Sequence, residues 1–284
     1  MLSVIAIGTS VAKGNEELQT VEAPLFDFAT LLLAIFAISV VFWFKQSKIH
    51  TLPRHSQLLF GVTPTMLALM CFAMFVLGGI GAWFGSGRGT QGTLSETAWM
   101  YSSSIIAQLP IVILYAKYSL KLRSRRVIPI SCIAFVVFVP LALSVAALSH
   151  AALVTTGMEL HTSLGHETLK QLIDAPMGVQ TWVVIVCVTV GAGIIEEVFY
   201  RGLLLPLFSE VFGGKTVWRA IIATSVFFAI MHIGVAQPSA ILGLFVLSIG
   251  LCWARVKSGG VLSPIVIHIV FNAMNIAFVY STHL

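Results

Sequence analysis

Charge is scarce in this sequence. Of its 284 residues, 16 are Lys or Arg and 11 are Asp or Glu, so that 10% are charged and 58% are hydrophobic. Soluble domains average about 25% charged residues. The shortage of charge therefore excludes an ordinary soluble domain and indicates a membrane protein.

Cysteine is also scarce, and several protease signatures are missing. The four cysteines (71, 132, 187 and 252) fall within apolar runs and show no CxxC spacing, which argues against a disulfide framework and a cysteine metal site. HETLK at 166–170 lacks the second histidine of the zinc motif HExxH. Neither the GxSG spacing of a rhomboid serine protease nor a GxGD aspartyl signature occurs.

Long apolar runs are what the sequence has in abundance. A helix needs about 20 apolar residues to cross the bilayer. Runs of suitable length occur at about 25–44, 58–84, 98–116, 128–154, 181–200, 217–235, 238–254 and 262–281. We therefore predict an all-α fold, a polytopic membrane helical bundle of about eight transmembrane helices.

The basic residues are distributed unevenly between the predicted loops. Thirteen of the 16 lie in or beside four alternate loops, at 45–57, 117–127, 201–216 and 255–261. Because cytoplasmic loops are enriched in Lys and Arg, we expect a multi-pass protein of the plasma (inner) membrane with both termini outside. The same distribution explains the net charge of +5 without a nucleic-acid partner.

A long loop at 157–180 separates two regions of different character. The spans before it carry few polar residues, whereas every intramembrane polar cluster follows it. We predict an accessory transmembrane region of about four helices at 1–156 and a functional core at 175–281.

The first polar cluster lies in GAGIIEEVFYRG, residues 191–202. A charge at the bilayer centre costs about 2.5–3.5 kcal/mol on insertion scales, so three charges there need an explanation. Glu197 and Arg201 are four residues apart and share one helix face, where they can pair. Glu196 lies about 100° around the helix, which leaves it as a candidate general base.

Two further clusters follow on separate spans. Phe228 and His232 are four residues apart in FFAIMHIG, and His268 and Asn272 are four apart in SPIVIHIVFNAMN. Each cluster alone is also compatible with a packing role, because a buried histidine or asparagine can hydrogen-bond between helices. Three such clusters within the last 90 residues indicate a functional site.

The order of these motifs resembles a known family. EEVFYR (196–201), FAIMH (228–232) and HIVFN (268–272) follow the pattern EExxxR, FxxxH, HxxxN of the CPBP intramembrane endopeptidases. This family is also called Abi or type II CAAX prenyl endopeptidase-like. The resemblance covers about 180–280 and implies a helical bundle whose C-terminal half holds a cavity open to one membrane face.

The resemblance also implies roles for residues. The catalytic positions would be Glu196, His232, His268 and Asn272, with Glu197, Arg201 and Phe228 in support. Glu196 would activate a water molecule with help from His232. His268 and Asn272 would polarise the scissile carbonyl and stabilise the oxyanion.

The sequence leaves two questions open. Glu196, His232 and His268 could instead hold a divalent metal such as zinc, which takes histidine and carboxylate ligands. The predicted activity is cleavage of a membrane-associated protein or peptide within the bilayer. The alternatives are an ion- or proton-coupled transporter, since intramembrane ionisable residues also mark proton relays, and a non-catalytic immunity or scaffold protein.

Overall fold

Helices make up almost all of the described chain. The computed structural model describes residues 28–46, 62–119, 126–156, 167–213 and 217–283. The helices are α1 (Phe28–Gln46), α2 (Pro64–Ser86), α3 (Leu94–Ser119), α4 (Val127–Thr155), α5 (Glu167–Asp174), α6 (Val179–Val186), α7 (Ala192–Glu197), α8 (Leu205–Val211), α9 (Val217–Ile230), α10 (Pro238–Ser258) and α11 (Leu262–His283), with π-helical segments η3 (Cys187–Gly191) and η4 (Val198–Leu204). The predicted all-α fold class is confirmed.

The predicted spans correspond closely to these helices. Six helical segments in the described ranges are long and apolar enough to cross a membrane, whereas Val217–Ile230 is apolar but shorter. The predicted division between 1–156 and 175–281 falls mostly on 157–166, which lies outside the described residues. That division stays a prediction.

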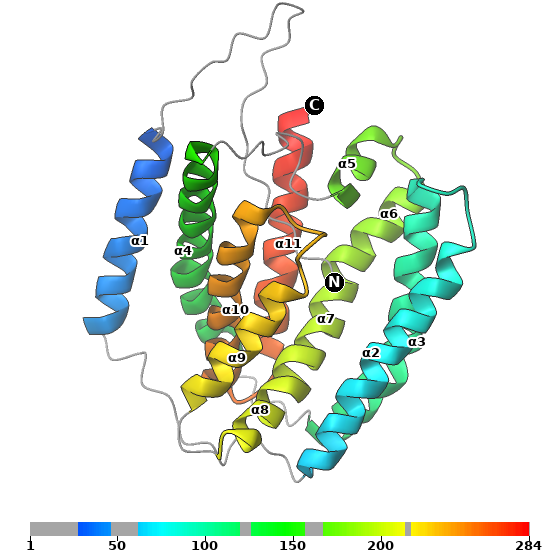
Figure 1. Ribbon diagram of the computed structural model, residues 1–284, viewed down its shortest axis with the longest axis horizontal. Coiled ribbons are helices and arrows are strands. Elements are labelled where there is room, and N and C mark those ends of the chain that lie inside the picture. The colour runs from blue at the N-terminus through cyan, green and yellow to red at the C-terminus, as the bar shows by residue number, and fades with distance from the viewer. Residues whose placement is uncertain (1–27, 47–61, 120–125, 157–166, 214–216, 284) are drawn as a thin grey trace, which may run out of the picture.

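The helices pack as a bundle around α10 (Figure 1). α4 packs along α10 and also contacts α1 and α11, while α9 lies against α10 and α8. On the other side, α2 and α3 form a hairpin that packs against the continuous helix running from α6 to α8. This arrangement places the middle of the long helix between the hairpin and the C-terminal helices.

The outside of the bundle is apolar. Ile38 on α1 and Phe72 and Trp83 on α2 are 69%, 69% and 77% exposed. Exposed apolar patches of this extent are rare on soluble monomers and mark contact with a partner or a membrane. With the apolar helices, they define an integral membrane protein.

Basic side chains gather at one end of the bundle. The chain ends of α1 and α3 and the start of α9 lie at the lower end of Figure 1, and they carry Lys45, Lys117 and Arg219. Arg201 and Arg255 do not belong to this group. Placing them in loops was wrong, because both lie inside helical segments and are fully buried.

Two helices near the polar clusters differ greatly in length. The segment Val179–Val211 has 33 residues, so the helix runs past Arg201 and is longer than the bilayer core is thick. By contrast, α9 has 14 residues and is about 21 Å long at 1.5 Å per residue. Because the apolar core is about 30 Å thick, a helix of this length can end within it, and His232 lies in the turn that follows.

Candidate active site

The two glutamates lie between two π-helical segments of the long helix. Glu196 and Glu197 end α7, with η3 before that helix and η4 after it. π-Helical turns disturb the regular ladder of backbone hydrogen bonds and often occur at functional sites. In this chain a backbone carbonyl in each segment accepts a side-chain donor, Asn272 Nδ2 to Val188 O at 2.8 Å and Arg255 Nε to Arg201 O at 3.2 Å.

A close helix approach brings the long helix against α11. A Cβ atom built on Gly193 would lie 2.6 Å from Ile269 Cγ1, so a larger residue would push α11 away. The Cβ-free surface of Gly193 therefore lets α7 approach the stretch of α11 that carries His268.

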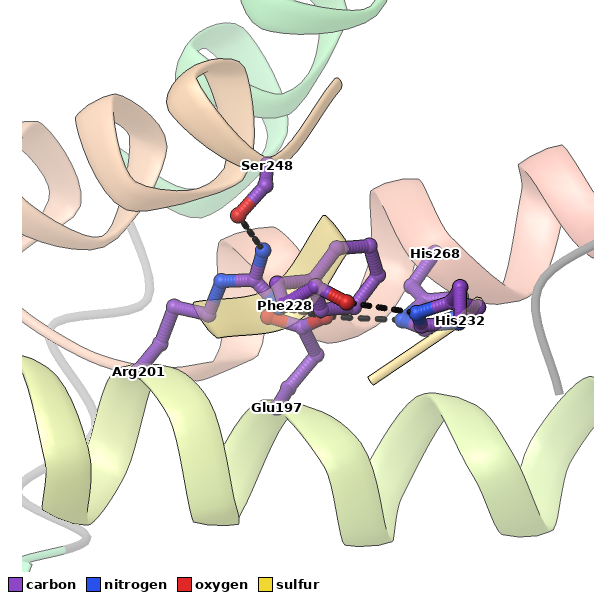
Figure 2. A network of polar contacts seen from close by, with 6 residues as sticks. All are labelled: Glu197, Arg201, Phe228, His232, Ser248 and His268. Atoms are coloured by element: carbon purple, nitrogen blue, oxygen red, sulfur yellow. Dashed lines mark hydrogen bonds and ion pairs between the residues drawn. The ribbon is translucent and has the colours of Figure 1, made fainter. Parts of the chain in front are cut away.

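Glu197 is the centre of the buried polar network (Figure 2). Its Oε1 accepts from Arg201 Nη1 at 2.9 Å, which is the i,i+4 ion pair expected from helical spacing. The same oxygen lies 2.7 Å from His268 Nδ1. Arg201 Nη2 also donates to Ser248 Oγ at 2.7 Å. One carboxylate thus joins the long helix to α11 through His268.

Phe228 fills the space between Arg201 and His232. The guanidinium carbon of Arg201 lies 4.7 Å from the centroid of the Phe228 ring, which is within the range of a cation–π contact. The rings of Phe228 and His232 have centroids 4.4 Å apart. The Phe228 carbonyl also lies 2.7 Å from His232 Nδ1, so this residue orients the imidazole through both its ring and its backbone.

The hydrogen-bond partners assign the tautomers of both histidines. A carbonyl oxygen only accepts, so His232 Nδ1 carries a proton and donates it to Phe228. Glu197 Oε1 already accepts from Arg201 Nη1, so His268 Nδ1 likewise donates to that oxygen. In the neutral form each imidazole therefore has its lone pair on Nε2. His232 Nε2 is buried and has no hydrogen-bond partner within the described part of the chain.

Glu196 lies on the wall of a cavity. It is 4% exposed and lines a cavity of about 360 Å³ together with Ile195, Tyr200 and Met231. The charge of Glu196 acts on His232, which follows Met231 in the chain, and His268 is also within electrostatic range of that imidazole. The structure therefore brings Glu196, His232 and His268 into one buried neighbourhood.

Asn272 lies one turn after His268 on α11 and is buried. Its amide nitrogen donates to Val188 O at 2.8 Å. Neighbouring Asn275 donates to Phe271 O at 2.9 Å within α11. The roles assigned to these side chains by the family resemblance stay predictions.

The side chains do not fit a three-ligand metal centre. The described residues contain no group of three His, Cys, Asp or Glu side chains placed to hold a metal ion. Glu196, His232 and His268 are the set implied for zinc, and they are all described. The mechanism proposed below therefore contains no metal step.

Sequence reasoning missed two residues of the network. Ser248 gives no signal in the sequence, because a serine in an apolar helix is common. Arg255 had the same signal as Arg201, a charge beside an apolar run, but it was assigned to a loop. Both come from α10, which packs against α9 and η4.

Fold and site together define a multi-pass helical membrane protein with a buried carboxylate–histidine centre beside a cavity. Residues 178–274 match the family model described as type II CAAX prenyl endopeptidase Rce1-like. This match confirms the resemblance predicted from the three motifs. The family is one of proteases, so the match supports endopeptidase activity in general. No curated protein and no solved structure matches the chain.

Proposed function

We propose that this protein is an intramembrane endopeptidase that hydrolyses a peptide bond of a membrane-associated protein or peptide. One observation carries the proposal. A buried imidazole nitrogen, His232 Nε2, has no protein partner in the described ranges and lies within electrostatic range of Glu196 on the wall of a cavity. This pair of acceptors can hold and deprotonate a water molecule.

The proposed chemistry begins with that water. One of its hydrogens points to the Glu196 carboxylate and the other to His232 Nε2, which directs an oxygen lone pair at the substrate carbonyl. Glu196 takes a proton as the water oxygen attacks the carbonyl carbon. When the C–N bond breaks, Glu196 returns the proton to the leaving amine. The cavity supplies the water-poor surroundings in which such charge transfer is effective.

The developing oxyanion needs donors. The side-chain amide of Asn272, which is buried on α11, is one candidate donor. His268 can donate through Nε2 only as an imidazolium, because its Nδ1–H already donates to Glu197. In this scheme Glu197, Arg201 and Phe228 orient the catalytic side chains without touching the substrate.

His232→Ala is expected to lower peptide cleavage at least about 100-fold, in the range of a lost general acid–base partner. The assay is cleavage of membrane peptides by purified protein in detergent, followed by mass spectrometry. His150→Ala, on α4, is the matched control and should keep wild-type activity. A His232→Ala protein that folds and cleaves normally would contradict the proposed mechanism. Chelation and metal analysis of the same sample test the zinc hypothesis, and we expect activity to survive chelation.

We also propose that the basic end of the bundle faces the cytoplasm, in a plasma (inner) membrane with both termini outside. The exposed side chains of Lys45, Lys117 and Arg219 at that end support this orientation. Alkaline phosphatase fused after Leu284 is expected to be active, because the C-terminus would lie outside. A fluorescent protein that folds only in the cytoplasm can be fused at the same position. Fluorescence of that fusion would report the opposite orientation.

A further inference from the structure

We propose that Gln108 on α3 binds the backbone of the substrate peptide, and that the α2–α3 hairpin forms the second wall of the substrate site. The inference rests on the proposed function and extends it to a part of the chain outside the matched segment 178–274. It gives the accessory region a specific task in substrate binding.

The cavity beside Glu196 has two walls from different parts of the chain. One wall comes from the long helix and carries Glu196, Phe199 and Tyr200. The other comes from α2 and α3 and includes Met74 and Gln108. A volume of about 360 Å³ lies in the range of small-molecule sites, so the cavity can take a few residues of an extended peptide.

Gln108 is held in a fixed orientation on its wall. Its Nε2 donates to Ser104 O at 3.0 Å and to Ser104 Oγ at 3.1 Å. Ser104 Oγ in turn donates to Gly78 O at 3.0 Å, which links α3 to α2. Because the Ser104 carbonyl only accepts, the network assigns the amide nitrogen to this side and the oxygen Oε1 to the other.

Gly78 on α2 leaves room for the side chain of Gln108. A Cβ atom built on Gly78 would lie 2.8 Å from Gln108 Nε2 and 3.0 Å from its Cδ. Glycine at this position therefore makes the space in which the carboxamide lies. The polar group is built into the hairpin interface and is not an incidental surface side chain.

The amide oxygen is an acceptor in need of a donor. Gln108 Oε1 accepts no hydrogen bond from the described residues, and Gln108 lies about midway along α3, which has 26 residues. A peptide entering an apolar cavity must pair its backbone N–H groups, because unpaired ones are costly to bury. An acyl chain has no N–H to offer. The chemistry of this wall therefore favours a peptide over a lipid tail.

Peptide binding can be measured apart from cleavage. We would use full-length Glu196→Gln protein in detergent and a dansyl-labelled hexapeptide of alternating leucine and alanine. Gln108→Met keeps the shape of the side chain but removes the acceptor, and is expected to weaken binding about 10-fold, as for a lost hydrogen bond. Ile106→Met, at a 64% exposed position of α3, is the control and should bind as tightly as the parent.

A scan of N-methylated peptides identifies the partner N–H. N-methylation at one peptide position should weaken binding to the parent protein about 10-fold. The same methylation should leave binding to Gln108→Met unchanged, as in a double-mutant cycle. Equal affinity of the parent and Gln108→Met for every peptide would overturn the inference, as would peptide displacement by a fatty acid to the same extent in both. Gln108-dependent binding by a wild-type protein that cleaves nothing would instead support the inference and contradict only the proposed function.

Discussion

Glu196→Gln is expected to abolish most cleavage while the protein stays folded. Glutamine has the size of glutamate but cannot take a proton from water, so kcat should fall about 100- to 10,000-fold, the usual contribution of a general base. The fold should survive because Arg201 and His268 are held by Glu197, and this contact is untouched by the substitution. KM should change little, since the side chain keeps its shape on the cavity wall.

The control for this prediction is another carboxylate of the same helix. Glu210, in α8 near the end of the long helix, is not part of the site, and Glu210→Gln should cleave as the wild type does. Both variants should unfold in detergent at the wild-type temperature. Undiminished cleavage by Glu196→Gln would show that another group activates the water.

Glu197→Leu is expected to produce the largest loss of stability. The carboxylate is fully buried and holds both Arg201 and His268. Its removal leaves the buried guanidinium without its counter-charge, and such changes cost about 3–5 kcal/mol. Thermal unfolding in detergent should therefore begin at a much lower temperature than for wild type or Glu196→Gln, although the two glutamates are adjacent.

Thermal unfolding can also measure the coupling energy between Glu197 and Arg201 in a double-mutant cycle. Arg201→Leu should also be strongly destabilising, because it leaves the Glu197 charge buried with only His268 beside it. The double variant Glu197→Leu/Arg201→Leu should lose less than the sum of the two single losses, since it buries no unpaired charge. Additive losses would mean that the 2.9 Å contact contributes no coupling energy.

Part of this architecture can be predicted from local rules. Apolar runs of membrane length set the helices, because every backbone polar group in lipid must be satisfied within the helix. The spacing of Glu197 and Arg201 sets their ion pair, because residues four apart share a helix face. Arg255 shows the limit of such rules, because it was assigned to a loop and is buried inside α10.

Contacts between distant segments could not be predicted in the same way. His268 reaches Glu197 across 71 positions of sequence, whereas the resemblance assigned it only to the substrate carbonyl. Two π-helical segments precede and follow the glutamates. Each extra residue in a π-helical turn rotates the following side chains by about 100°. A sequence pattern read with a period of 3.6 residues does not reveal this rotation.

The sequence by itself determined that this is a membrane protein, where most of its helices lie, and that Glu196 and Glu197 lie within an apolar span. These properties follow from composition and from spacing along one helix. Only the tertiary structure decided that Glu197 holds His268, that Arg255 reaches the Arg201 carbonyl, and that Gln108 lines the cavity of Glu196. The physical reason is that these contacts depend on the rotation and close approach of packed helices, which no single segment encodes.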